Sequence, residues 1–165
     1  GVLYMSSWTS IIKNSTKKAI DILKKRGNYH LIDIGCGKGK VLCVWELMFK
    51  KDTPEILGID YSDQLIKICL ANLKIINSRK SSVMKMDALD INLNEIDDKL
   101  LIYLYNPFNK KILIPFLKKI KNKPTAIIYN NPIHNDIFKK NNFELRYKKD
   151  GWHPNATYNI YSNFI

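Results

Sequence analysis

Three glycines at every second position, Gly35, Gly37 and Gly39, follow a mostly apolar run at 30–34. Bulky and branched apolar residues in such a run suit a strand that is buried on both faces. Glycine can turn the chain at positive φ, and it lets bare backbone approach a ligand that any Cβ would repel. The apolar segment 41–50 suits a helix whose first N–H groups point back into this turn. The spacing therefore predicts a ligand-binding edge between a buried strand and a helix.

Carboxylates end the predicted strands beside this turn. Asp33 stands at the end of the first strand, and Asp60 ends the short apolar segment 55–60. An acid at the tip of the second strand is placed to accept hydrogen bonds from both hydroxyls of a ribose. A strand-end aspartate is also a common helix cap, although Ser62 or Asp63 would serve that role equally well. Together with the glycine turn, Asp60 favours a bound nucleoside whose ribose is unphosphorylated.

The pattern D-x-G-x-G-x-G from Asp33 to Gly39 resembles the first motif of the class I methyltransferases, which bind S-adenosylmethionine (SAM). It does not fit the dinucleotide fingerprint G-x-G-x-x-G, because Lys40 occupies the position of the third glycine. In the methyltransferases the turn wraps the methionine half of the cofactor, and an acid at the position of Asp33 lies near its ammonium group. A tight loop without a ligand is the alternative interpretation.

The segment 86–90 resembles the adenine-binding motif of the same family. There an aspartate after the third strand bonds the adenine amino group and the next backbone N–H meets a ring nitrogen, which implies Asp87 and Ala88. Asp90 is an alternative acid, and two solvated loop carboxylates are the other interpretation. The resemblance implies SAM as the cofactor, held by Asp33, Gly35, Cys36, Gly37, Gly39, Asp60, Tyr61, Asp87, Ala88 and Asn106.

The triplet Asn106, Pro107, Phe108 follows the most apolar predicted strand, 100–105. Proline cannot continue a buried strand, so the sheet must end there and expose Asn106 at its carboxyl edge. The triplet resembles the motif [D/N]-P-P-[Y/F/W] of amino-methylating enzymes, in which the first side chain accepts a hydrogen bond from the target amine and the aromatic ring stacks on it. One proline is missing, which leaves hydroxyl targets open. It resembles more closely the N-P-F of small bacterial methyltransferases whose glycine motif also reads G-C-G-K-G.

Three polar residues, Asn106, His134 and His153, are the candidate catalytic groups. Because SAM carries an excellent leaving group, such an enzyme mainly has to align a nucleophile and exclude water. A hydroxyl nucleophile would need a base, for which either histidine is a candidate, whereas an amine would need only an acceptor such as Asn106. Each histidine alone is more often a surface or packing residue. Pro107, Phe108 and Trp152 are the predicted acceptor-binding residues.

The 165 residues are 45% hydrophobic and 25% charged, which suits one domain with a sizeable core. The chain lacks an apolar run long enough for a membrane span and reads as soluble and cytoplasmic. Three cysteines without a C-x-x-C pair argue against a disulfide framework and a zinc site. The net charge of +12 comes mostly from dispersed lysines, which suggests a solvated surface and leaves an anionic acceptor open.

The predicted elements alternate between strand and helix. The helical N-terminal segment 1–27, with a break near Asn14 and Ser15, would cover one face of the sheet. Strands and helices then follow in the minimal methyltransferase layout, with a helix after each of the first five strands and a closing pair around the loop 150–155. We therefore expect a single Rossmann-like class I methyltransferase fold over residues 1–165, with a mostly parallel seven-stranded sheet, one antiparallel strand and helices on both faces. In that layout Trp152 and His153 would overhang the same crevice as Asn106 and His134.

Three functions are compatible with these residues. The first is transfer of a methyl group from SAM to an O or N atom of a small-molecule or saccharide acceptor. The second is an amino-methylating enzyme that acts on nucleic acid or protein, which the charge and the Asn-Pro-Phe motif favour, although the chain has no insert for target recognition. The third is a domain that binds SAM or a partner without chemistry.

Overall fold

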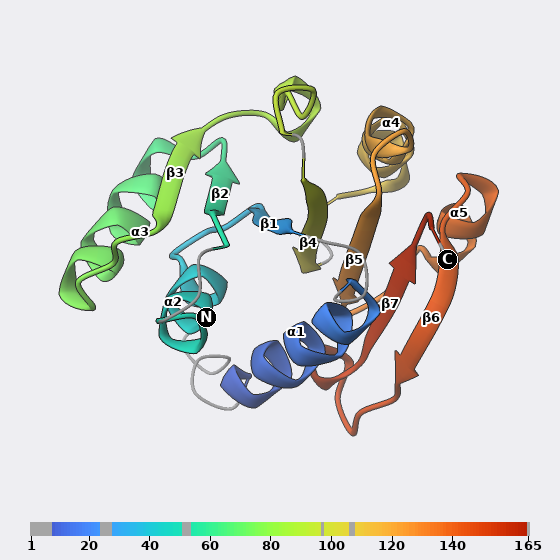
Figure 1. The fold of residues 1–165 in the computed structure, drawn as a ribbon, viewed down its shortest axis with the longest axis horizontal. Helices are drawn as coiled ribbons and strands as arrows, with labels where there is room; N and C mark the ends of the chain where they lie inside the picture. Colours follow the sequence, from blue (N-terminus) through green and yellow to red (C-terminus); the bar gives the residue numbers. More distant parts are fainter. Residues whose placement is uncertain (1–7, 24–27, 51–53, 97, 106–107, 165) are drawn as a thin grey trace.

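The computed structural model describes residues 8–23, 28–50, 54–96, 98–105 and 108–164. Within these ranges seven strands form one sheet in the order β3-β2-β1-β4-β5-β7-β6 (Figure 1). The pairs among β1 to β5 are parallel, and β7 is antiparallel to both β5 and β6. The expected sheet, with a single antiparallel strand, is confirmed. The strands are β1 Tyr29–Ile34, β2 Ile56–Asp60, β3 Ser81–Lys85, β4 Lys99–Tyr105, β5 Thr125–Asn130, β6 Glu144–Lys149 and β7 Tyr158–Ser162.

Helices cover both faces of this sheet. Figure 1 shows α1 and α2 on one side of the sheet and α4 on the other. Two separate clusters of buried apolar side chains fill the spaces between the sheet and these helices. None of the helices in the described ranges has the length and apolar character that crossing a membrane requires. The helices are α1 Thr9–Leu23, α2 Lys40–Met48, α3 Asp63–Ile75, α4 Lys110–Ile120 and α5 Asn135–Lys140, with short 3₁₀ turns at η2 Ala88–Asp90 and η3 Pro154–Ala156.

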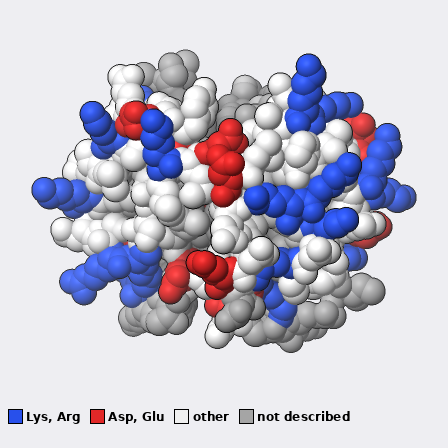
Figure 2. Space-filling view, turned by 90° about the horizontal axis from the view of Figure 1, so that it is seen from above, with Lys and Arg blue, Asp and Glu red and all other residues white. Residues whose placement is uncertain are grey.

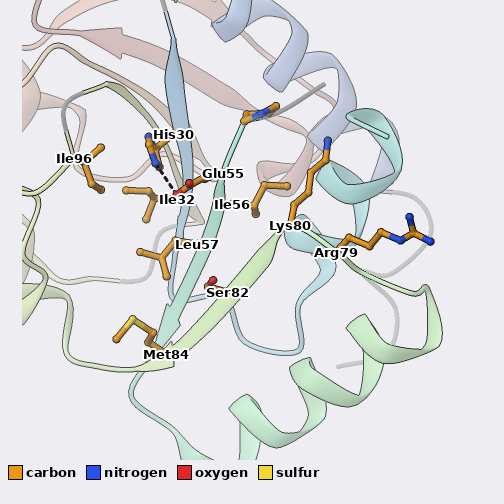
Figure 3. A pocket seen from close by; sticks show the side chains of 11 residues that line it. His30, Ile32, Glu55, Ile56, Leu57, Arg79, Lys80, Ser82, Met84 and Ile96 are labelled. Atoms are coloured by element: carbon orange, nitrogen blue, oxygen red, sulfur yellow. Dashed lines mark hydrogen bonds and ion pairs between the residues drawn. The ribbon is translucent and has the colours of Figure 1, made fainter. Parts of the chain in front are cut away.

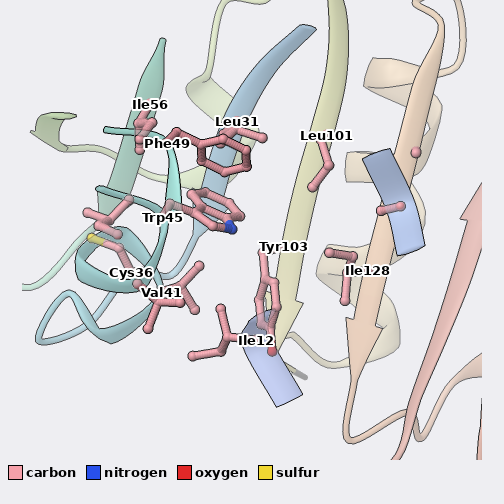
Figure 4. Close-up of a cluster of buried hydrophobic side chains, with 14 of the residues drawn as sticks. Ile12, Leu31, Cys36, Val41, Trp45, Phe49, Ile56, Leu101, Tyr103 and Ile128 are labelled. Atoms are coloured by element: carbon pink, nitrogen blue, oxygen red, sulfur yellow. The ribbon is translucent and has the colours of Figure 1, made fainter. Parts of the chain in front are cut away.

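Trp45 joins α2 to α1 and to the centre of the sheet (Figure 4). The side chain is fully buried, its Nε1 donates to Thr16 Oγ1 at 2.9 Å, and its ring meets the edge of Tyr103 with centroids 6.2 Å apart. A buried indole needs a partner for its N–H, and the α1 hydroxyl supplies it. Trp45 therefore fixes how the first two helices sit above β1 and β4.

The expected break at Asn14 and Ser15 is wrong, because α1 runs without interruption from Thr9 to Leu23. Ser15 is buried, and its Oγ donates to the Ile12 carbonyl oxygen at 3.2 Å. A serine can satisfy its hydroxyl on the preceding turn of a helix as well as at a helix start. Burial against the sheet decides between these uses, and Ser15 lies on the same buried face as Ile12 and Ala19.

The helix expected between β3 and β4 is also missing from the described residues. The connection contains only the 3₁₀ turn Ala88–Asp90, which begins where the Asp87 side chain accepts a hydrogen bond from Leu89 N at 2.9 Å. Ile91 and Leu93 are buried at alternate positions, a spacing that suits extended chain and not a helix. The family layout called for a helix that these residues do not encode.

Candidate cofactor and acceptor site

The glycine turn joins β1 to α2 in a conformation that favours glycine at all three positions. Gly35, Gly37 and Gly39 have φ values of 78°, 52° and 89°, in the left-handed region. A Cβ on Gly39 would lie 2.7 Å from Cys69 Sγ, whereas a Cβ on Gly37 would meet no atom within 4 Å. The turn is therefore packed tightly against α3 at Gly39 and open at Gly37, where a ligand could reach the backbone.

Asp60 ties the tip of β2 to this turn. Its Oδ2 accepts a hydrogen bond from Gly37 N at 2.9 Å, and its Oδ1 accepts one from Ser62 N at 3.0 Å. The helix cap of α3 is instead Ser62, whose Oγ accepts from Leu65 N at 3.3 Å. Each carboxylate oxygen has a second lone pair, so Asp60 keeps two acceptor positions for the hydroxyls of a ribose.

Asp33 is buried beneath the same turn and is only 3% exposed. Burial raises the pKa of its carboxyl well above the usual value, and the charges of Cys69 and Asp60 raise it further. A cation bound nearby would stabilise the charged form and lower this pKa. The carboxyl is therefore suited to neutralising an ammonium group that enters the site.

Two thiols lie between the glycine turn and α3. The interaction between the thiols of Cys36 and Cys69 raises the pKa of Cys36 and lowers that of Cys69. Cys69 is fully buried and Cys36 almost so, and neither is in a disulfide. Their side chains belong to the cluster that packs α2 and α3 on the sheet. Cys36 therefore supports the turn from inside, and any contact with a ligand is through its backbone.

Asp87 stands beside Asp60 at the carboxyl edge. Met86 N donates to the Asp60 carbonyl oxygen at 2.9 Å, and Asp87 follows with an exposed side chain. Ala88 is buried behind it, and Tyr61, after β2, is 78% exposed. Because β1, β2 and β3 are neighbours in the sheet, the predicted acids Asp33, Asp60 and Asp87 lie at three adjacent strand tips.

The predicted site residues Asn106 and Pro107 lie outside the described residues. The acceptor motif is therefore described through its neighbours Tyr105 and Phe108. Tyr105 ends β4 at the carboxyl edge with its side chain exposed. Phe108 is half-buried, and its ring lies 5.8 Å from that of Phe116 on α4. The Phe108 ring therefore packs on the helix and offers only part of its surface to an acceptor.

Hydrogen bonds fix the loop between β6 and β7 at the same edge. Asn130, at the end of β5, donates from Nδ2 to the carbonyl oxygens of Asn155 and Thr157 at 3.0 and 2.9 Å. Its Oδ1 accepts from the Tyr103 hydroxyl at 2.9 Å. The Tyr105 hydroxyl is hydrogen-bonded to the Asn155 side chain. The loop thus overhangs the carboxyl ends of β4 and β5, beside the chain that leads into Asn106.

This loop brings Trp152 and His153 against Trp8, at the start of α1. The rings of Trp8 and Trp152 are stacked at 5.9 Å, and that of His153 lies 5.4 Å from Trp8. His153 Nδ1 accepts a hydrogen bond from Asn155 N at 3.1 Å. Since a backbone N–H can only donate, the proton of the neutral ring is on Nε2. His153 therefore presents a donor to the site, and this arrangement does not suit a general base.

His134 lies on the other side of the sheet edge. Its backbone N–H donates to the Tyr129 hydroxyl at 3.1 Å, and Tyr129 packs on Phe138 of α5. His153 packs on Trp8 near α1. The two histidines of the predicted catalytic set are thus held by elements on opposite faces, and no contact joins them.

Four residues at this edge were not predicted from the sequence: Trp8, Tyr105, Asn130 and Asn155. Among the described aromatic side chains only Tyr61, Tyr105 and Trp152 are exposed, and each ends or follows a strand at the carboxyl edge. An aromatic residue directly after a predicted strand would have been a usable signal. Trp8 and Asn130 contact partners that are distant in the sequence, so no local sequence pattern indicates these contacts.

A hollow lies on the sheet face where the described residues between β3 and β4 form no α-helix (Figure 3). It has a volume of about 600 Å³ and an apolar floor that includes Ile32, Leu57 and Met84. At its rim, His30 Nε2 lies 3.0 Å from Glu55 Oε2, and His30 Nδ1 lies 3.2 Å from Asp98 Oδ2. His30 and Glu55 lie near the amino ends of β1 and β2, away from the glycine turn.

Viewed from above, acidic side chains gather along the middle of the molecule, with Lys and Arg on both sides (Figure 2).

Comparison with known proteins gives a short sequence match and broad structural matches. No family model matches the sequence. An rRNA N(6)-adenosine-methyltransferase of Caenorhabditis elegans is 36% identical over 61 residues, which is 36% of this chain and 28% of that protein.

The structural matches extend over most of the chain. A magnesium protoporphyrin IX methyltransferase from Synechocystis PCC 6803, with bound SAM, has a TM-score of 0.62 at 9% identity, covering 92% of this chain and 77% of its own. A SAM-dependent methyltransferase from Aquifex aeolicus has a TM-score of 0.60 at 14% identity, covering 92% and 97%. The chain therefore has the Rossmann-like fold of the class I SAM-dependent methyltransferases.

Proposed function

We propose that this chain is a SAM-dependent methyltransferase that acts on an O or N atom of a small-molecule or saccharide acceptor. The observation that carries the proposal is the double use of Asp60, whose carboxylate holds the open glycine turn at Gly37 while keeping two acceptor positions. The three acids at adjacent strand tips match the three parts of SAM in order. Structural neighbours of the same fold are crystallised with SAM, which supports the assignment.

In this proposal the cofactor lies across the tips of β1, β2 and β3. The backbone of the turn at Gly35, Cys36, Gly37 and Gly39 surrounds the methionine half, and Asp33 neutralises its ammonium group. Asp60 accepts from the ribose hydroxyls next to the exposed Tyr61. Asp87 and the Ala88 N–H address the adenine. Bound SAM supplies a methyl group on a sulfonium, so the protein needs no acid to activate the leaving group.

The acceptor in this proposal lies beyond β4. Asn106 orients the nucleophile by accepting its hydrogen, while Pro107, Phe108 and Trp152 form the walls. A hydroxyl acceptor would use His134 as its base, since His153 Nδ1 already accepts from backbone. An amine acceptor would need only Asn106. The main work of these residues is alignment and exclusion of water.

A second candidate is methylation of nucleic acid, which the match to the rRNA adenosine methyltransferase favours. The net charge of +12 is consistent with a polyanionic acceptor. A third is a domain that binds SAM without chemistry. Turnover of labelled SAM over a panel of small molecules, saccharides and RNA separates these three, because a non-catalytic domain would show binding without methyl transfer to any of them.

Calorimetric titration with SAM and S-adenosylhomocysteine (SAH) tests the proposal. We expect both to bind, and we expect Asp60→Asn to weaken binding by about tenfold or more, because it removes the charged acceptor for two ribose hydroxyls. Asp63→Asn is the matched control, since Asp63 is exposed nearby and pairs with Lys85 instead. Circular dichroism confirms that each variant is folded. If neither SAM nor SAH gives heat of binding in a folded sample, the proposal is rejected.

A further inference from the structure

We propose that Trp8, Trp152 and His153 form a stacking platform for the nucleobase of a nucleotide acceptor. The inference rests on the proposed function, because it names the class of acceptor that this methyl-transfer site would take. It adds Trp8 to the site and gives His153 the role of a hydrogen-bond donor to the acceptor.

Trp152 presents most of its side chain to solvent. The side chain is 84% exposed, and Trp8 backs it at 5.9 Å with an interplanar angle of 28°. Large aromatic side chains are usually buried to a considerable extent, and exposed apolar surface of this kind commonly marks a binding site. The contact with Trp8 leaves most of the indole surface open to a ligand.

Several hydrogen bonds fix the loop that carries Trp152. Thr157 Oγ1 accepts from Gly151 N at 3.0 Å and bonds the His153 carbonyl oxygen at 3.1 Å. Asn130 anchors the other end of the loop through two carbonyl oxygens. Gly151 packs so closely that a Cβ on it would lie 2.5 Å from the Ala156 carbonyl oxygen. A fixed loop lowers the entropy cost of binding, because its aromatic face is already ordered.

The three rings have the chemistry that binds nucleobases. Successive aromatic side chains beside a site for planar ligands are the usual means of binding unpaired bases, which stack on tryptophan and histidine. The Nε2–H of neutral His153 can donate to an acceptor on the base edge, because Nδ1 is occupied by Asn155 N.

A basic side chain lies on the same side of the sheet as the three rings. Lys149 is exposed at the end of β6, and it pairs in register with Tyr158, which points to the α1 side of the sheet. Side chains of paired residues share a face, so Lys149 lies on the side where Trp8 packs. With 27 basic against 15 acidic residues, the chain favours an anionic ligand. A free nucleotide and a nucleotide within single-stranded RNA share this base-plus-phosphate chemistry.

The test measures nucleotide binding with saturating SAH present, so that an adenine site is occupied. Adenosine monophosphate and a single-stranded oligoadenylate are titrated by calorimetry, and glucose 1-phosphate is the control that keeps the phosphate and lacks a base. We expect both nucleotide probes to bind and Trp152→Ala to weaken them roughly tenfold or more. The affinity of Trp152→Ala for SAH should be unchanged. Ile75→Ala, which truncates another exposed apolar side chain, is the matched control and should change neither affinity.

The outcomes separate this inference from the proposed function. Nucleotide binding that depends on Trp152 supports the platform, and a much higher affinity for the oligoadenylate identifies an RNA strand as the source of the base. Three results would overturn the inference. Glucose 1-phosphate could bind as tightly as adenosine monophosphate, or Trp152→Ala could leave nucleotide binding unchanged. The third is a protein that binds SAH but no nucleotide. Loss of SAH binding in the unmodified protein would instead reject the proposed function.

Discussion

Alanine at Gly39 should mainly destabilise the protein, whereas alanine at Gly37 should mainly weaken ligand binding. Both residues have positive φ, so alanine at either one carries backbone strain of roughly 1–2 kcal/mol. At Gly39 the new Cβ would also lie 2.7 Å from Cys69 Sγ, which adds roughly 1–3 kcal/mol of overpacking. We therefore expect Gly39→Ala to lower the free energy of unfolding by about 2–5 kcal/mol. Gly37→Ala, whose Cβ meets open space, should cost only the strain.

Urea unfolding followed by tryptophan fluorescence gives both free energies, and calorimetry with SAM gives the affinities. Gly37→Ala should remain folded and lose SAM affinity, because its Cβ would occupy space where the ligand approaches the backbone. The double-mutant cycle of Gly39→Ala with Cys69→Ala isolates the steric part of the loss in unfolding free energy. Because Cys69→Ala removes the atom that the new Cβ meets, the coupling free energy should be about 1–3 kcal/mol. Equal destabilisation by the two glycine substitutions, or a cycle without coupling, would refute this account of the turn.

Two further predictions concern buried polar groups. The raised pKa of Asp33 means that the folded state binds its proton more tightly than the unfolded chain, so stability should fall as pH rises above the ordinary value of 3.8. Asp33→Asn should remove this fall and be the more stable protein at neutral pH, which urea unfolding at a series of pH values measures; an unchanged pH profile would contradict it. Asn130→Ala leaves Tyr103 and two loop carbonyls without their partner, so we expect a loss of about 1–3 kcal/mol in unfolding free energy. The KM of this variant for the acceptor should rise, while its affinity for SAM should stay the same. A loss of SAM affinity as well would contradict the idea that Asn130 acts only by holding the loop.

The inner strands β1, β2, β4 and β5 were predictable because they are largely apolar runs, whereas the outer strands β3 and β6 are more polar and mostly exposed. The seven strands appear at the predicted places, and the glycine turn follows β1 as its spacing requires. The error at Ser15 has a physical cause, since its hydroxyl is satisfied inside a helix as readily as at a cap. The missing β3–β4 helix was expected from the layout, whereas the alternation of Ile91 and Leu93 already indicated extended chain.

The site was predictable where its residues are local in sequence and hidden where they are not. The sequence indicated that Asp60 ends a strand beside the glycine turn, whereas its hydrogen bond to Gly37 N is seen only in the fold. The pairing of Trp8 with Trp152 joins the two ends of the chain, and no pattern in either segment announces the other. The tautomer of His153 likewise depends on the backbone of Asn155, which only the folded loop supplies.

The described residues between β3 and β4 form no α-helix, and the part of the sheet face that they leave open implies uneven local stability. β3 is an edge strand with mostly exposed side chains, whereas β4 and β5 are buried along nearly their whole length. Amide hydrogens of β3 should therefore exchange with deuterium through local opening, well before those of β4 and β5. Because Met86 N bonds the Asp60 carbonyl at the tip of this strand, a ligand that bridges Asp60 and Asp87 should slow that exchange.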